Sequence, residues 1–223
     1  MSKKLFAEAI AKFLLGVVLV GVAVFWPAGS FAYINGWLFM GVLFVPMFAA
    51  GIVMMAKSPA LLKSRLEAKE KQRDQNLVVK LSGLMFIAGF LVAGFGYRYG
   101  WYSVPLGISI GAAAVFLLGY VMYAEVLREN AYLSRTIKVQ EGQKVIDTGL
   151  YGIVRHPMYS ATLLLFLAMP LVLGSLWSLL IFLVYPLLIA VRIKGEEKLL
   201  EEELEGYRAY KKKVKYRLIP FIW

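Results

Sequence analysis

Long apolar runs that carry almost no ionisable side chains restrict this chain more than any other feature. A helix of about 20 such residues crosses a hydrocarbon core of roughly 30 Å. The runs are residues 9–26, 31–56, 78–97, 103–123, 157–173 and 176–191. We therefore predict an all-α integral membrane protein with about six transmembrane helices, the last two forming a short hairpin around Gly174 and Ser175.

The basic residues test this count independently. Of the 25 Lys and Arg residues, 24 lie in four segments: residues 3–12, 57–80, 128–155 and 192–217. Six helices place all four segments on one side, which the positive-inside rule makes cytoplasmic. We therefore predict that both termini are cytoplasmic. Aromatic anchors are expected at the opposite interface, namely Trp26, Tyr33, Trp37, Tyr97, Tyr99, Trp101 and Tyr102.

The predicted helices divide the chain into two parts. Residues 1–123 hold about four transmembrane helices and a basic loop at 57–80, which is either a solvated connection or a helix on an anionic membrane surface. Residues 124–223 form the second part, with a transmembrane hairpin at about 157–193 and a cytoplasmic tail. We expect the first run to be a retained helix, because no small-residue cleavage site of a signal peptide follows it cleanly.

Two residue types are scarce, and their scarcity excludes several kinds of site. The chain has no cysteine and a single histidine, His156. Disulfides, a thiol nucleophile, Cys-based metal centres and multi-histidine metal sites are therefore excluded. We predict no metal site and no nucleic-acid partner.

Two polar clusters flank the predicted hairpin. The first is Arg155-His156-Pro157-Met158-Tyr159, in which proline fits the first turn of a helix. Its cations would lie at a helix N-terminus that already favours an anion, although they could also be ordinary interfacial residues. The second cluster holds Arg192, Glu196 and Glu197, which taken alone could be a surface ion pair on a solvated helix face.

A hairpin returns the chain to the side from which it started, so these two clusters should meet at the cytoplasmic interface. Cations of the first cluster would bind a carboxylate, and an acidic side chain of the second would accept hydroxyl hydrogens or face a positive centre. Such a pocket would suit a zwitterion that carries a sugar.

These motifs resemble those of the isoprenylcysteine carboxyl methyltransferase family, which is related to phospholipid N-methyltransferases. The resemblance covers residues 139–223 and includes Gly149-Leu150-Tyr151, the Arg-His-Pro-Met-Tyr run, Glu196-Glu197, Tyr207, Tyr210 and Arg217-Leu218-Ile219-Pro220. It implies S-adenosylmethionine as the methyl donor in a cytoplasmic pocket. It also implies a lipophilic or prenylated substrate that enters from the bilayer, with membrane lipid as a partner.

The resemblance also implies roles for individual residues. Arg192, Glu196 and Glu197 would be catalytic, with Arg192 facing the reacting group of the substrate. The donor would be bound by Gln140, Gly149, Leu150, Tyr151, Arg155, His156, Tyr159, Glu196 and Glu197. The sequence departs from the family pattern at Leu150, where proline is common, and in Ser160-Ala161 after the second tyrosine, so the acceptor stays open between a carboxylate and an amine.

Two other functions remain open at this stage. Membrane sterol reductases that use NADPH end in similar Arg-His-Pro and Tyr-Arg-x-Ile-Pro motifs. A non-enzymatic scaffold whose basic loops bind anionic lipid would share the charge pattern. No glycine-rich strand-to-helix turn of a soluble nucleotide-binding fold is present where it would be needed.

Overall fold

The structure is a computed structural model that describes residues 3–66, 73–101, 104–133 and 139–223. These residues form helices and no β-strand. In chain order, the helices are α1 (Lys3–Ala28), α2 (Ile34–Lys57), α3 (Pro59–Leu66), α4 (Arg73–Arg98), α5 (Leu106–Glu129), the 3₁₀ turn η1 (Gly149–Gly152), α6 (Pro157–Val172), α7 (Leu176–Phe182), α8 (Tyr185–Glu203) and α9 (Tyr207–Lys213).

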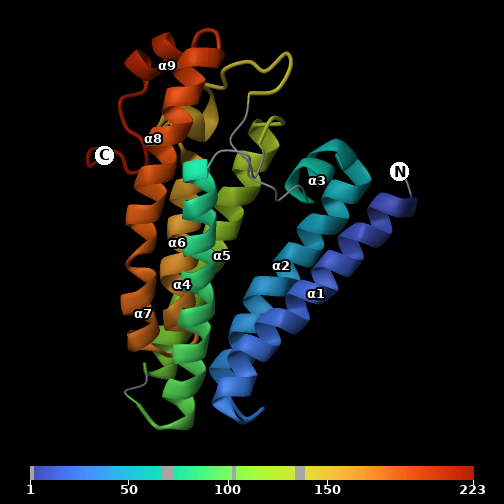
Figure 1. Cartoon of the computed structure of the whole chain (residues 1–223), viewed down its shortest axis with the longest axis vertical. Coiled ribbons are helices and arrows are strands. Elements are labelled where there is room, and N and C mark those ends of the chain that lie inside the picture. Colours follow the sequence, from blue (N-terminus) through green and yellow to red (C-terminus); the bar gives the residue numbers. More distant parts are fainter. Residues whose placement is uncertain (1–2, 67–72, 102–103, 134–138) are drawn as a thin grey trace.

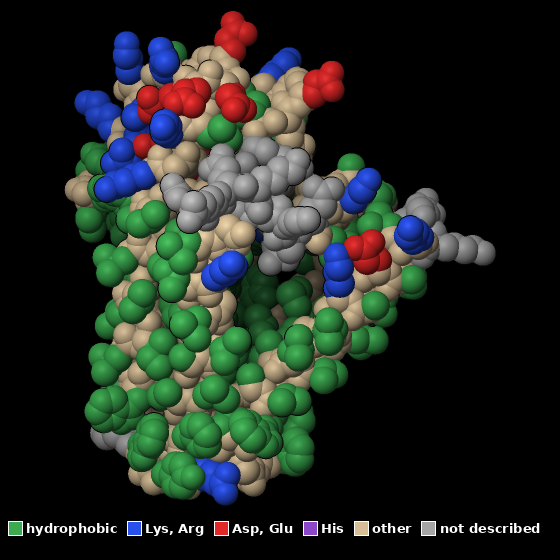
Figure 2. Space-filling view, viewed as in Figure 1, with side chains coloured by type: hydrophobic (Ala, Val, Ile, Leu, Met, Phe, Trp, Pro, Cys, Tyr) green, Lys and Arg blue, Asp and Glu red, His purple; other side chains and the backbone are tan. Residues whose placement is uncertain are grey.

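The predicted class, an all-α integral membrane protein, is confirmed. Within the described residues, α1, α2, α4, α5 and the α7–α8 unit are long and apolar enough to cross a membrane, and α6 is a shorter apolar helix. Figure 2 shows hydrophobic side chains over the flanks of the molecule, whereas Lys, Arg, Asp and Glu gather mostly at the end that carries α9. This distribution is what a lipid-embedded bundle with one charged end requires.

The helices form two groups (Figure 1). Helices α4, α5, α6, α7 and α8 make an upright bundle, and the α1–α2 pair leans away from it at the end that carries α3. Close helix approach depends on small residues. A Cβ on Gly94 would lie 2.5 Å from the ring of Pro27, and one on Gly119 would lie 2.9 Å from Leu165. These glycines therefore join α4 to α1 and α5 to α6.

The predicted last span, residues 176–191, is not one continuous helix. The chain breaks between α7 and α8 at Leu183 and Val184, because Pro186 has no amide hydrogen to continue the ladder and restricts the residue before it. Helix α8 then runs on to Glu203, twelve residues past the predicted end of the span. This extension carries Arg192 and Glu197 on one rigid helix.

The predicted aromatic anchors separate into two kinds. Trp26, Trp37 and Tyr99 are 71%, 54% and 61% exposed, as expected at an interface. Tyr33 is buried instead: its ring stacks on Tyr97 with centroids 4.5 Å apart, and its hydroxyl donates to a carbonyl at the end of α6. The anchor prediction is therefore wrong for Tyr33, and Tyr102 lies outside the described residues.

The basic loop at 57–80 contains a helix, as its leucine spacing allowed. Helix α3 is that element, and its Leu62 is buried within the protein. Residues 67–72 lie outside the described part of the chain.

Candidate active site

The turn before α6 is fixed by a glycine. Gly149 has φ +50, and a Cβ there would lie 1.8 Å from the carboxylate of Glu129 at the end of α5. That carboxylate accepts a hydrogen bond from the amide of Leu150 at 3.2 Å, and Asn130 donates to the hydroxyl of Tyr151 at 2.9 Å. Burial raises the pKa of Tyr151 and keeps its hydroxyl neutral. Helix α5 thus positions the turn that leads into the first cluster.

The C-terminal segment lies against the start of α6. The amides of Arg155 and His156 each donate at 2.9 Å, to the carbonyls of Tyr216 and Arg217 respectively. The hydroxyl of Ser160 donates to the same segment at 2.6 Å. The tail therefore covers the first turn of α6, where the first helical residue is a proline as predicted.

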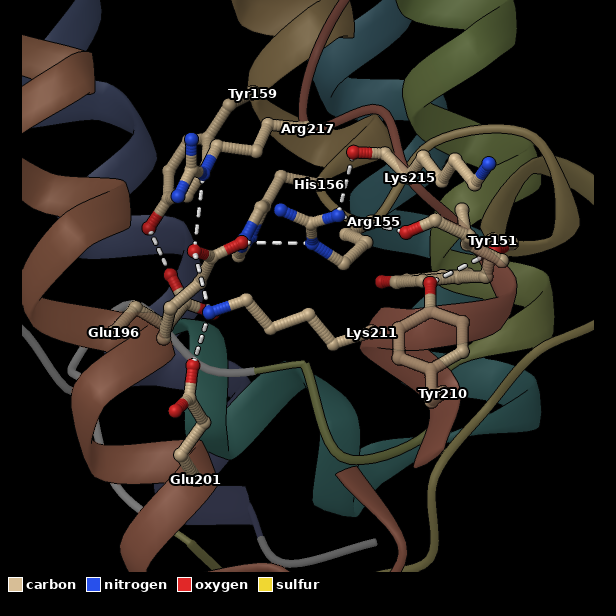
Figure 3. A network of polar contacts seen from close by, with 12 residues as sticks. Tyr151, Arg155, His156, Tyr159, Glu196, Glu201, Tyr210, Lys211, Lys215 and Arg217 are labelled. Carbon is tan, nitrogen blue, oxygen red and sulfur yellow. Dashed lines mark hydrogen bonds and ion pairs between the residues drawn. The ribbon is translucent and has the colours of Figure 1, made fainter. Parts of the chain in front are cut away.

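The carboxylate of Glu197 joins the two predicted clusters, and Figure 3 labels its partners Arg155, His156 and Arg217. Its Oε1 accepts from Arg155 Nε at 2.8 Å and lies 3.3 Å from His156 Nε2, while its Oε2 accepts from Arg217 Nε at 3.0 Å. Lys211 Nζ lies 3.9 Å from Oε2. Glu197 is only 3% exposed, so its charge needs these cationic partners in order to be buried. The prediction that the two clusters meet is confirmed.

The guanidinium of Arg155 is largely occupied by the protein itself. In addition to Glu197, it donates from Nη1 to the carbonyls of Val214 and Lys215, each at 2.7 Å. Such multiple contacts suit the fixed fork of an arginine. Arg155 therefore fastens the tail to α8 as well as lining the cleft described below.

A second hydrogen-bond network, which we call the relay, connects Arg192 and Glu196 through Tyr159. The hydroxyl of Tyr159 donates to Glu196 Oε2 at 2.6 Å and accepts from Arg192 Nε at 3.0 Å. Arg192 and Glu196 are therefore connected through a tyrosine of α6 as well as being one turn apart on α8. The relay positions a cation and an anion side by side at the wall of the cleft.

These side chains line a cleft that is partly open to solvent. Six of the predicted site residues lie on its walls: Tyr151, Arg155, His156, Tyr159, Arg192 and Glu196. Met158, Leu199, Leu200 and Leu204 add apolar surface. A cleft with apolar walls and a few convergent polar groups is typical of a small-molecule site.

The other predicted site residues lie behind these walls. Glu197 holds Arg155 and His156 in place, and Gly149 and Leu150 form the turn that is fixed to Glu129. Gln140 contacts the carbonyl of Tyr132 through its side chain. Their roles in donor binding stay predictions.

The cleft also has polar wall residues to which the sequence analysis assigned no role. They are Asn130, Tyr132, Gln143, Lys144, Tyr207 and Tyr210. Tyr207 is 4% exposed, and its buried hydroxyl has no hydrogen-bond partner among the described residues. Burial and the nearby Glu197 and Glu196 raise the pKa of Tyr207, so the hydroxyl stays protonated and available to a ligand. The position of Tyr207 in the C-terminal motif was the only sequence signal for a role in the cleft.

Residues 139–148, which precede η1, contact Tyr132 after α5 and Lys213 of α9. The hydroxyl of Tyr132 donates to the carbonyl of Gly142 at 3.1 Å, and Lys213 Nζ lies 2.7 Å from Asp147. The hydrogen bond from Lys213 lowers the pKa of Asp147. Among the described residues, no group of three or more His, Cys, Asp or Glu side chains could hold a metal ion.

The fold and the cleft together define a class: a multi-span helical membrane protein with a polar cleft at one end of its bundle. Comparison with known sequences finds a family match over part of the chain. Residues 108–205 match the family described as phospholipid methyltransferase. The matched region begins in α5 and ends just after α8, so it includes both clusters and the turn between them. The resemblance that the motifs indicated is thereby confirmed.

Two known proteins are similar to part of the chain. The delta(14)-sterol reductase TM7SF2 of Mus musculus is 32% identical over 91 residues, which is 40% of this chain and 22% of the reductase. The uncharacterized protein YpbQ of Bacillus subtilis (strain 168) is 32% identical over 100 residues, or 44% of this chain and 60% of that protein. The chain therefore spans less than two thirds of either relative.

Proposed function

We propose that this protein is a membrane methyltransferase that takes a methyl group from S-adenosylmethionine and transfers it to a lipophilic acceptor. The observation that carries the proposal is the meeting of the two clusters: Arg155 and His156 contact Glu197, and Tyr159 contacts both Arg192 and Glu196. The match of this same region to the phospholipid methyltransferase family supports the reaction type.

The residues of the cleft fit the chemistry of that donor. S-adenosylmethionine carries an amino-acid zwitterion, a sulfonium cation, ribose hydroxyls and adenine. Glu196 offers a carboxylate to a cation or to hydroxyl hydrogens, and Tyr207 offers a buried hydroxyl that no described residue engages. Leu199, Leu200 and the tyrosines offer apolar and aromatic wall for a purine.

Once bound, the donor supplies an electrophilic methyl group that an acceptor displaces in line. The protein mainly has to align donor and acceptor and exclude water, which requires no metal. The relay from Arg192 through Tyr159 to Glu196 would fix the orientation of the two charged side chains during that alignment. Glu197 would act through Arg155 and His156, whose positions it sets.

The acceptor determines which charged side chain matters most. A carboxylate such as that of an isoprenylcysteine is already ionised and needs orientation, which Arg192 would give through paired N–H groups. An amine has to lose a proton, for which Glu196 is the candidate base. A carboxylate enzyme should therefore lose more kcat/KM in Arg192→Lys than in Glu196→Gln, and an amine enzyme should show the reverse order.

The proposed acceptor reaches the cleft from the bilayer. Figure 2 shows a hollow between the α1–α2 pair and the bundle, with hydrophobic side chains on its visible walls. A lipid chain in this hollow would bring its head toward the charged end of the molecule. We propose that this end, and with it both termini, faces the cytoplasm, which the distribution of Lys and Arg supports.

An NADPH-dependent reductase is the second candidate, because part of the chain is 32% identical to a sterol reductase. The two functions differ in the ligand of the cleft. Calorimetry on purified protein should detect S-adenosylhomocysteine at micromolar concentrations and no NADPH. Binding of NADPH without binding of S-adenosylhomocysteine would favour the reductase over the methyltransferase.

Variants connect that binding to the cleft. His156→Ala and Glu197→Gln should each weaken S-adenosylhomocysteine by at least about 1 kcal/mol, because each removes or loosens a charge-assisted contact at the wall. Glu203→Gln, at the exposed end of α8, is a matched control and should bind like the wild type. Equal affinity in all three variants would show that the ligand binds elsewhere.

A further inference from the structure

The outer face of α8 changes from apolar to basic within one helical turn. Leu187 and Val191 are 68% and 53% exposed, and Lys194 and Lys198 follow them on the same face, at spacings of three and four residues. Three residues of helix rise by about 4.5 Å, so the last exposed apolar side chain and the first lysine are adjacent. The boundary between hydrocarbon and headgroups should cross the helix between Val191 and Lys194.

Beyond this boundary lies a second cleft, which is open to solvent. Five basic residues from three segments line it: Lys194 and Lys198 of α8, Arg208 and Lys211 of α9, and Arg217 of the tail. Figure 2 shows blue side chains gathered at this corner of the molecule, beside the upper part of α8.

Three acidic residues of the same cleft neutralise only some of this charge. Lys211 is bound to Glu201, and Arg217 to Glu197. Lys194, Lys198 and Arg208 have no carboxylate within ion-pair distance in the described part of the chain. The remaining acid, Glu202, leaves the lining with five positive and three negative charges. Three exposed cations, Lys194, Lys198 and Arg208, therefore remain at the membrane boundary.

The tail that supplies Arg217 also carries exposed apolar side chains. Phe221 and Ile222 are 87% and 76% exposed, although they follow directly on residues that are packed against α6. Arg217 lies over the ring of Trp223, with its guanidinium carbon 5.2 Å from the ring centroid. A surface that combines exposed apolar side chains with basic residues is what the interfacial region of an anionic membrane binds.

We propose that this second cleft binds the headgroup of one anionic phospholipid, with the phosphate held by Lys194, Lys198 and Arg208. The acyl chains lie along Leu187 and Val191, on the lipid-facing side of α8. The site is separate from the candidate active site, since the wall between them is α8 itself with the buried carboxylate of Glu197. Charge complementarity favours an anionic ligand. The exposed apolar side chains of Leu187 and Val191 favour a lipid over free phosphate.

The test is native mass spectrometry of the full-length protein in detergent, titrated with phosphatidylglycerol or phosphatidylcholine. Wild-type protein should retain phosphatidylglycerol preferentially. The triple variant Lys194→Gln/Lys198→Gln/Arg208→Gln should bind phosphatidylglycerol at least about tenfold more weakly, since each basic residue near an anionic surface contributes about fivefold. Inorganic phosphate at the same concentration should not displace the lipid.

A charge-matched control distinguishes this cleft from a general attraction to positive protein. Lys57→Gln/Lys80→Gln/Lys212→Gln removes three exposed lysines outside the cleft and should retain the wild-type lipid affinity. All substituted side chains are exposed, and an unchanged melting temperature in detergent verifies that both variants fold. Equal loss in the two variants, equal retention of both lipids, or displacement by inorganic phosphate would overturn the proposal.

Discussion

Replacing Glu197 by glutamine tests the buried ion network directly. The two oxygens of Glu197 accept from Arg155 and Arg217 at 2.8 and 3.0 Å. A glutamine keeps one oxygen and turns the other into a donor, so one arginine loses its acceptor and the other keeps only a neutral one. A lost partner in a buried site costs about 1–3 kcal/mol, and a weakened charged bond costs about 1 kcal/mol more. We expect Glu197→Gln to destabilise the protein by about 3 kcal/mol.

The measurement is thermal unfolding in detergent, followed by circular dichroism. For a chain of this length, about 3 kcal/mol lowers the midpoint by about 6–12 °C. Glu201→Gln, one turn further along α8, is the matched control: its pair with Lys211 is 32% and 36% exposed, so the expected loss is below about 1 kcal/mol. Equal midpoints for Glu197→Gln and wild type, or equal losses in the two variants, would refute the structural role of this network.

Three further predictions concern the cleft, the membrane bundle and the topology. Tyr207→Phe should weaken S-adenosylhomocysteine by about 1 kcal/mol in calorimetry without lowering the melting midpoint, because its hydroxyl has no partner among the described residues; a destabilised variant would contradict this. Gly94→Ala places a Cβ 2.5 Å from Pro27 and should lower the midpoint by an amount equivalent to about 1–3 kcal/mol, whereas Gly83→Ala, with open space around it, should not; equal effects would disprove close α1–α4 packing. A reporter fused after Trp223 should read as cytoplasmic, and an external signal would overturn the six-crossing topology.

The sequence was sufficient for the parts of the fold that depend on hydrophobic length. The apolar runs correspond to α1, α2, α4, α5, α6 and the α7–α8 unit, because a hydrocarbon core demands long uncharged helices. The meeting of Arg155 with Glu197 was also predictable, since a hairpin has to return to its starting side. Here the return of the hairpin was enough to predict which side chains meet.

Other features depended on tertiary contacts that no local pattern encodes. Tyr33 resembles an interfacial anchor in sequence, but a carbonyl at the end of α6 accepts its hydrogen bond inside the bundle. The extension of α8 to Glu203 lacks an apolar run and is held by contacts to α6 and to the tail. Tyr132 and Gln143 lie in or beside an irregular segment without periodicity, so their place on the cleft wall could be found only from the structure.

The most direct test of the whole account is methyl transfer itself. Purified protein is mixed with membrane lipid extract and S-adenosylmethionine labelled in its methyl group, and the lipid fraction is analysed by mass. We predict that label appears in a lipophilic product with wild-type protein and is strongly reduced with His156→Ala. Absence of labelled lipid with a protein that binds the donor, or equal labelling by the variant, would contradict the proposed chemistry of the cleft.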